Sequence, residues 1–272
     1  MNYLQFDFDI ESPDQLGKLI ALLAEKGFEG FEEEENNLAA FIPEQNFNQT
    51  EFSQVIDLFS TLSYTRTTLE NINWNKKWEE NFLPVFIGNF AVIRAGFHQP
   101  VKNVAHEIVI TPKMSFGTGH HATTYLMIEH MQQLDFTGKS ILDFGTGTGV
   151  LAILASKLGA EKILAIDYDE WSIKNAKENI EQNGCSNIIV EQLDAVPDGE
   201  KFDIILANIN LNVIVSNIAS IATSSFTGAT IVLSGFLKEN DLALLNALNE
   251  AGLQYLSTMQ RGDWIAVIAK KT

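Results

Sequence analysis

One stretch of this chain, residues 140–167, constrains the fold more than any other: SILDFGTGTGVLAILASKLGAEKILAID. It opens with an apolar run, 141–144, that predicts a short buried strand bounded by turn residues. Glycines follow at alternate positions from Gly145 to Gly149, and an apolar pattern with helical spacing comes next. A second apolar run then ends on Asp167. This order of strand, glycine turn, helix, strand and carboxylate predicts a mononucleotide-binding βαβ unit.

The glycine turn also indicates which ligand the unit binds. Glycines let the backbone approach a ligand that a Cβ would exclude, and Asp167 is placed to accept hydrogen bonds from a ribose diol. A dinucleotide fingerprint requires a third glycine at position 150, where this chain has Val150. The pattern Asp-x-Gly-x-Gly-x-Gly from Asp143 instead resembles motif I of the S-adenosylmethionine-dependent methyltransferases. The alternative is a glycine-rich turn in some other α/β protein.

Length and composition set the outer bounds. With 272 residues, 46% of them hydrophobic, the chain suffices for one or two globular domains. Its single cysteine, Cys185, excludes an internal disulfide and suggests a reducing compartment. The start, MNYLQFDFDI, lacks the basic and apolar regions of a signal peptide, and no apolar run is long enough to cross a bilayer. We therefore expect a cytoplasmic protein without a membrane segment.

The net charge of −17 bears on the choice of partner. Such a surface repels the phosphate backbone of nucleic acids, and no basic stretch rises above scattered Lys and Arg. A basic protein or peptide would be attracted instead, although solubility alone also explains the charge. We therefore expect no direct binding of nucleic acid.

The first part of the chain predicts a separate small domain. Its pattern gives, in order, a strand at 3–10, a helix from Ser12-Pro13 to Gly27, a hairpin from 28–33 and 38–42, a helix at 52–59 and a strand at 63–70. The order β-α-β-β-α-β is that of the ferredoxin-like split motif, so residues 1–70 are expected to form an α+β domain. The acidic run Glu32–Glu35 is either a solvated turn or an edge for a basic partner.

The remainder is expected to be a linker, 71–84, and a larger domain, 85–272. Trp74, Trp78 and Phe82 recur every four residues and predict a short helix that Pro84 ends. Beyond the linker the pattern predicts a hairpin at 85–93, a helix ending near 183–184, strands at 188–193, 202–207, 229–233, 253–259 and 264–269, and a helix at 239–251. The last two strands are expected to form an antiparallel hairpin.

A second unusual stretch, TPKMSFGTGHHATT at 111–124, precedes the glycine turn. His120 and His121 suggest a metal at first sight, but adjacent side chains point apart and lack helical ligand spacing. A loop that covers a ligand and ends on the Thr123-Thr124 hydroxyls explains the stretch better. A helix is expected to begin near Ala122.

The motif Phe-Gly-Thr-Gly-His-His-x-Thr-Thr at 116–124 resembles the signature of the ribosomal protein methyltransferases that modify large-subunit ribosomal protein eleven. The Trp-x-x-x-Trp linker and the small N-terminal domain match this family too. The resemblance implies a class I, Rossmann-like methyltransferase domain with a seven-stranded, mostly parallel sheet whose last strand is antiparallel. It also implies S-adenosylmethionine as cofactor, and trimethylation of the N-terminal α-amine and certain Lys ε-amines of a substrate that the ferredoxin-like domain recognises.

The resemblance implies site residues as well. The implied cofactor contacts are Thr124, Gly145, Asp167 and Asn208, with Asp143, Gly147 and Phe116 as neighbours. Asn208 follows the fourth strand, in a sequence similar to motif IV of amino-group methyltransferases, and would position the amine. Asp194 could meet the adenine amino group or be a simple turn carboxylate, and Asn210 has no assigned role. We expect no metal, no covalent nucleophile and no essential general base, because methyl transfer depends chiefly on positioning.

Two alternatives remain open at this point. One is a methyltransferase for another protein or for a small-molecule amine, and the other is a nucleoside-binding regulator without turnover. A monomer is expected in each case.

Overall fold

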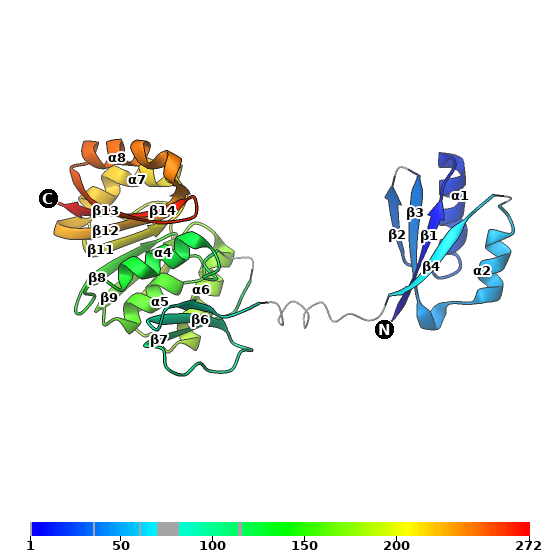
Figure 1. The fold of residues 1–272 in the computed structure, drawn as a ribbon, viewed down its shortest axis with the longest axis horizontal. Coiled ribbons are helices and arrows are strands. Elements are labelled where there is room, and N and C mark those ends of the chain that lie inside the picture. The colour runs from blue at the N-terminus through cyan, green and yellow to red at the C-terminus, as the bar shows by residue number, and fades with distance from the viewer. Residues whose placement is uncertain (1, 35, 60, 70–81, 114–115) are drawn as a thin grey trace. The chain divides into compact units, whose positions relative to one another are not determined.

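The computed structural model describes residues 2–34, 36–59, 61–69, 82–113 and 116–272 (Figure 1). The chain divides into two compact units, Met1–Asn81 and Phe82–Thr272, and each is described by itself. The linker helix predicted at 71–84 lies outside the described residues as far as 81.

The first unit is a four-stranded antiparallel sheet with two α-helices. Its elements are β1 (Tyr3–Asp9), α1 (Pro13–Ala24), β2 (Gly30–Glu34), β3 (Asn37–Pro43), the short 3-10 helix η1 (Glu44–Asn46), α2 (Gln49–Ile56) and β4 (Tyr64–Leu69). The strand order β2-β3-β1-β4 confirms the predicted ferredoxin-like arrangement. Ser12 caps α1 and Pro13 begins it, as predicted. The unit has its own core, in which Phe6 and Phe52 pack with ring centroids 4.5 Å apart.

The second unit is built on a seven-stranded sheet in the order β10-β9-β8-β11-β12-β14-β13. The strands are β8 (Ser140–Phe144), β9 (Lys162–Asp167), β10 (Ile188–Gln192), β11 (Phe202–Asn208), β12 (Ser225–Leu237), β13 (Leu253–Arg261) and β14 (Trp264–Lys271). All pairs are parallel except those of β14, which runs antiparallel to β12 and to β13. The structure therefore confirms the predicted sheet and its C-terminal hairpin.

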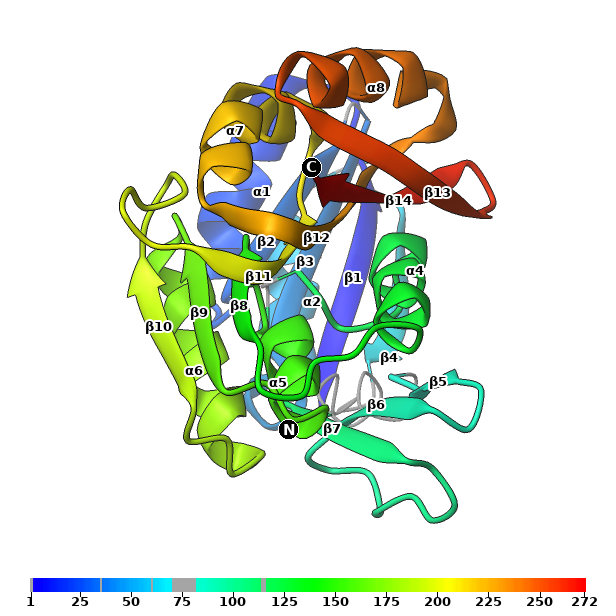
Figure 2. The same ribbon diagram turned by 90° about the vertical axis from the view of Figure 1, so that its left-hand side faces the viewer.

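Helices cover both faces of this sheet. They are α4 (Ala122–Met131), α5 (Val150–Lys157), α6 (Glu170–Gln182), α7 (Leu211–Thr223) and α8 (Asp241–Glu250), with the 3-10 helix η2 (Lys238–Asn240) before α8. Ile141 of β8 belongs to the core formed with α4, α5 and α6, whereas its neighbour Leu142 belongs to the core formed with α7 and α8. Alternation along a strand thus fills two hydrophobic layers. Figure 2 shows α7 and α8 side by side.

A small sheet, β5-β6-β7, also belongs to this unit. Its strands are β5 (Val85–Ile87), β6 (Ala91–Ala95) and β7 (His106–Ile110). The hairpin predicted at 85–93 is confirmed by the antiparallel pairing of β5 with β6, whereas β7 and α7 were not predicted. No helix in the described parts of the chain is both long and apolar enough to span a bilayer.

Candidate active site

The glycine turn after β8 depends on glycine for both conformation and space. Gly145, Gly147 and Gly149 have φ of 78°, 54° and 81°. These angles lie in the left-handed region of backbone conformation, which residues other than glycine rarely adopt. A Cβ on Gly145 would lie 2.1 Å from a side-chain methyl of Ile209, and one on Gly147 would lie 2.3 Å from the carbonyl oxygen of Phe116. The turn is therefore packed tightly between two other segments of the chain.

Asp167 ends β9 next to this turn. Its Oδ2 accepts a hydrogen bond from the Gly147 N–H at 2.9 Å, and its Oδ1 accepts one from the Asp169 N–H at 3.1 Å. The residue is only 7% exposed, but it lines the cavity. A carboxylate has about four lone-pair sites, so roughly two remain for a ligand. The two backbone bonds hold the carboxylate in a fixed orientation at the cavity wall.

Asp143 lies beneath the turn and is not among the residues that line the cavity. It is fully buried, and its Oδ2 accepts hydrogen bonds from the Thr146 hydroxyl at 2.7 Å and from the Ala152 N–H at 3.2 Å. Burial raises the pKa of Asp143 to about 6. Asp143 therefore supports the turn and the start of α5 from within the core.

Asn208, the last residue of β11, reaches α4. Its side-chain N–H donates to the Thr124 hydroxyl at 3.3 Å, and the residue is 8% exposed. Its buried carbonyl oxygen has no hydrogen-bond partner among the described residues. Thr124 is fully buried and does not line the cavity, so it acts through Asn208. An orphaned buried acceptor costs about 1–3 kcal/mol, which points to a ligand that donates to it.

The loop that contains Phe116 is fastened to the glycine turn by Thr148. The Thr148 N–H donates to the Phe116 carbonyl at 2.9 Å, and the Thr148 hydroxyl donates to the Gly117 carbonyl at 2.7 Å. The ring of Phe116 lines the cavity and is 52% exposed. The motif at 116–124 is thus bonded directly to the glycine turn.

A second fastening comes from α6. The fully buried Asn179 accepts a hydrogen bond from the Thr111 N–H and donates one to the Thr148 carbonyl, both at 2.8 Å. One turn later, Asn183, the C-cap of α6, accepts from the Val109 N–H and donates to the Val109 carbonyl. Asn179 and Asn183 are four residues apart, which is about 6 Å along a helix. Val109 and Thr111 are two residues apart, which is about 6.6 Å along a strand, so the two spacings match. Asn183 thus hydrogen-bonds to the outer edge of β7, as a neighbouring strand would. Asn179 connects Thr111, in the loop after β7, with Thr148 in the glycine turn.

An aromatic wall closes another side of the cavity. The His121 ring lies 5.2 Å from that of Phe116 and 4.5 Å from that of Trp264, measured between centroids. His121 Nδ1 accepts a hydrogen bond from the Thr123 N–H as the cap of α4. Burial lowers the pKa of His121, so the ring is neutral near pH 7. The wall is therefore uncharged.

His120 points to other partners. Its Nε2 lies 3.0 Å from the Leu83 carbonyl oxygen, and its Nδ1 lies 3.2 Å from the Thr118 hydroxyl. Among the described residues, no group of His, Cys, Asp and Glu is arranged to hold a metal ion.

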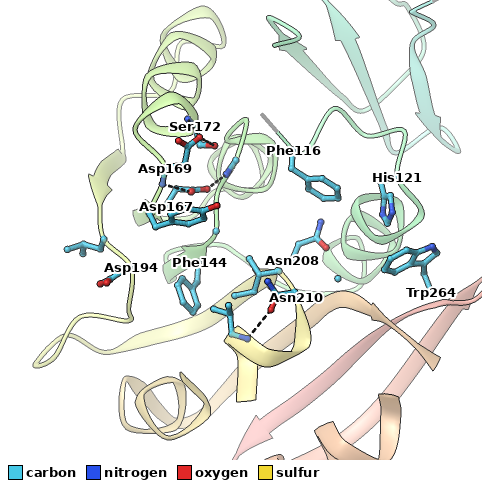
Figure 3. Close-up of a pocket in the computed structure, with 17 residues that line it drawn as sticks. Phe116, His121, Phe144, Asp167, Asp169, Ser172, Asp194, Asn208, Asn210 and Trp264 are labelled. Atoms are coloured by element: carbon cyan, nitrogen blue, oxygen red, sulfur yellow. Dashed lines mark hydrogen bonds between the residues drawn. The ribbon is translucent and has the colours of Figure 1, made fainter. Parts of the chain in front are cut away.

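These elements enclose a cavity of about 760 Å³ at the carboxyl ends of the central strands (Figure 3). It is lined by Phe116, His121, Phe144, Gly145, Gly147, Asp167, Tyr168, Asp169, Ser172, Leu193, Asp194, Asn208, Ile209, Asn210, Val213, Gly235 and Trp264. Figure 3 shows the acidic residues Asp167, Asp169 and Asp194 on one side and the aromatic wall on the other, with Asn208 between them.

Five of the seven residues that the resemblance implied line this cavity, namely Phe116, Gly145, Gly147, Asp167 and Asn208. Thr124 and Asp143 lie behind it. Sequence reasoning missed Trp264, which begins β14, and Gly235, which lies in a bulge of β12. Neither has a local motif, because strand crossovers bring both residues to the cavity.

The cavity suits a nucleoside ligand. Its volume lies within the ordinary range of roughly 300–1,000 Å³ for small-molecule sites. A Cβ at Gly145 or Gly147 has no room within the closely packed turn, and the carboxylate of Asp167 retains free acceptor sites beside it. A seven-stranded sheet with antiparallel β14, and a cavity at this edge, define a class I methyltransferase.

Comparisons with known proteins identify the family. The family profile "Ribosomal protein L11 methyltransferase (PrmA)" matches residues 15–272. Proteins named ribosomal protein L11 methyltransferase from Bacteroides fragilis and Porphyromonas gingivalis are 38% and 37% identical to this chain. Each alignment covers 98% of this chain, and 99% and 97% of the respective relatives. The chain therefore belongs to the ribosomal protein L11 methyltransferase family.

A solved structure agrees with this assignment. The crystal structure of ribosomal protein L11 methylase from Lactobacillus delbrueckii subsp. bulgaricus superposes with a TM-score of 0.65 at 28% identity. The match covers 70% of this chain and 98% of that one. The predicted family, with its S-adenosylmethionine-dependent methyltransferase fold, is confirmed.

Proposed function

We propose that this chain transfers methyl groups from S-adenosylmethionine to the N-terminal α-amine and Lys ε-amines of ribosomal protein L11 in the cytoplasm. Family membership and the names of the relatives support this acceptor. The net charge of −17 also suits a basic acceptor protein. The choice of amines comes from the resemblance at residues 116–124.

The acidic side of the cavity would hold the cofactor. Asp167 would accept hydrogen bonds from the ribose hydroxyls with the lone pairs that its backbone bonds leave free. The backbone of Gly145 and Gly147 would lie against the ligand, Asp194 would face the adenine amino group, and Phe116 would cover the site. When bound, the cofactor supplies an electrophilic methyl group on a sulfonium.

Thr124 and Asp143 would contribute indirectly. Thr124 accepts the hydrogen bond from Asn208, and Asp143 supports the glycine turn through Thr146. Both would therefore fix the positions of groups that line the cavity without touching the cofactor.

The observation that carries the proposal is the orphaned carbonyl oxygen of Asn208. An amine N–H can donate to it, which would fix the nitrogen and aim its lone pair across the cavity. The donor bond from Asn208 to Thr124 prevents the amide from turning freely. Because the side chain is uncharged, it positions an amine without holding an extra proton on it.

The aromatic wall favours the same reactive form of the amine. Only a neutral amine has a lone pair to donate, and a poorly hydrated environment disfavours an ammonium ion. Phe116 and Trp264 give this side of the cavity an apolar surface, and His121 adds no positive or negative charge near neutral pH. We expect water to take the proton, with no side chain acting as an essential base.

The N-terminal domain, residues 1–70, is proposed to recognise the acceptor protein. It has a separate core and places the acids Glu32 to Glu34 on an exposed strand, β2. Such an edge is suited to a basic partner.

The test combines the pure protein, S-adenosylmethionine and ribosomal protein L11, followed by intact-mass and peptide mass spectrometry. Mass gains equal to whole numbers of methyl groups are expected at the α-amine and at Lys. Removing residues 1–81 should reduce the rate with the protein acceptor while cofactor binding persists. Cofactor binding without transfer to L11 would refute the proposal and favour another acceptor or a regulator without turnover.

A further inference from the structure

A second cavity of about 290 Å³ adjoins the first. Three residues, Asn210, Gly235 and Trp264, line both cavities. The other lining residues are Leu211, Asn212, Phe236, Leu237 and Asn240. A ligand that occupies the second cavity therefore lies next to the side of the first that contains Trp264.

One wall of the second cavity is the edge of β12. Strand β11 pairs with β12 only as far as the pair Asn208 and Ser234, whereas β12 continues to Leu237. A bulge separates these parts at Gly235, which has φ of 101° and would place a Cβ 2.2 Å from the Ile209 carbonyl oxygen. Beyond the bulge, β12 has no strand neighbour on its β11 side among the described residues. A sheet edge of this kind can pair with an extended chain.

The side chains around this edge suit a peptide. Those of Asn212 and Asn240 form no hydrogen bond with another described residue, and each amide has both a donor and an acceptor to offer a peptide group. Leu211 and Leu237, both partly exposed, add an apolar surface. No lining residue of the second cavity is charged, so an inorganic anion or a metal ion would find no charged partner there.

The surrounding charges favour a basic occupant. Glu239 and Asp241 flank the lining residue Asn240, and Asp263 precedes the lining residue Trp264. The basic neighbours are Lys238 and Arg261, which pairs with Trp264 across the β13–β14 hairpin, so acidic residues outnumber basic ones by three to two. Charges of this kind increase the rate of encounter with a basic partner.

We propose that the second cavity is a subsite for the acceptor polypeptide, which runs extended along Gly235–Leu237 and passes Trp264 so that its amine reaches Asn208. This inference rests on the proposed function. It assigns Asn212 and Asn240 to recognition of the peptide groups beside the methylated residue.

The test uses Asn212→Trp, which fills the second cavity, and Ala219→Trp as its matched control. Both residues are exposed on α7, and seven residues place them on nearly the same helical face about 10 Å apart. With ribosomal protein L11 as acceptor, Asn212→Trp should raise KM at least tenfold and leave the Kd of S-adenosylmethionine within twofold. Ala219→Trp should change neither constant. Circular dichroism and Tm verify that both variants are folded.

Hydrogen–deuterium exchange provides a second measurement on the wild-type protein. Saturating L11 should slow exchange of the amides at 235–240 at least fivefold. An unchanged KM for folded Asn212→Trp, or unprotected amides at 235–240, would overturn the subsite. If Asn212→Trp does not fold, the exchange result decides. Failure of the wild-type enzyme to methylate L11 would instead refute the proposed function, and this inference with it.

Discussion

Asp167 offers the sharpest test of the cofactor site. Replacing it with Ala removes the carboxylate that is proposed to accept the ribose hydroxyls, and also the acceptor of the Gly147 and Asp169 N–H groups. A hydrogen bond to a charged group contributes about 1.5–3 kcal/mol. Since about 1.4 kcal/mol corresponds to tenfold in affinity, loss of one such bond raises Kd roughly ten- to a hundredfold.

Isothermal titration calorimetry with S-adenosylmethionine measures this change directly. Asp167→Asn serves as a second variant, because it preserves the shape and one oxygen acceptor but removes the charge. The control is Asp198→Ala, which removes an exposed carboxylate of the same domain that does not line the cavity. We expect this control to change Kd by less than about twofold, because exposed charges away from a ligand contribute little.

The stability of each variant must be measured in parallel. Two backbone N–H groups that lose their acceptor in Asp167→Ala cost about 1–3 kcal/mol each if they stay buried, so Tm should fall. A folded Asp167→Ala protein whose Kd equals that of the wild type would refute the role of this carboxylate. A Kd that rises equally in Asp198→Ala would show a general effect of charge instead.

Three further predictions concern protons and the fastening of the loop. Because burial raises the pKa of Asp143 to about 6, the folded state loses stability relative to the unfolded chain as pH rises from about 4 to 6. Chemical denaturation should therefore show the stability of Asp143→Asn rising by about 2.5 kcal/mol relative to wild type between pH 4 and 7, and a constant difference would contradict this. Asn179→Ala and Asn183→Ala should both lower Tm, because each loses buried hydrogen bonds. Only Asn179→Ala loses the bond to Thr148 in the glycine turn, so only this variant should raise the Kd of S-adenosylmethionine severalfold. Equal Kd values in the two variants would show that the bond from Asn179 to Thr148 does not support the cofactor site. Under subsaturating acceptor, Lys methylation should rise about tenfold per pH unit between 7 and 9 while α-amine methylation levels off near 8, whereas parallel profiles with one shared pKa below 8 would reveal an enzyme base.

Local sequence determined the elements that carry the site. The alternation in 3–10 and the apolar runs around Gly145 are short-range signals, and the strands that they predicted are present. The motif predicted a glycine turn at Gly145 and Gly147. The positive φ and the close packing of both residues explain why glycine is required there. These features were readable because each depends on a few consecutive residues.

Helix α7 was missed in the sequence because its signals conflict. Val213, Ile214 and Val215 are β-branched and have low intrinsic helix propensity. Asn210 nevertheless caps the helix, and its buried residues Ile214, Ile218, Ile221 and Ala222 recur with helical spacing. The parallel pairing of β11 with β12 requires a crossover connection, and that requirement agrees with the helical signals.

Only the tertiary structure decided which side chains meet at the cavity. Thr124 and Asp143 belong to the recognised motifs, yet one lies behind Asn208 and the other beneath the turn. Trp264 lies far along the chain from His121, and the antiparallel insertion of β14 beside β12 brings their rings together. A motif specifies local geometry, whereas the exposure of a side chain depends on every segment packed against it, so cavity walls assembled by strand crossovers require the complete fold.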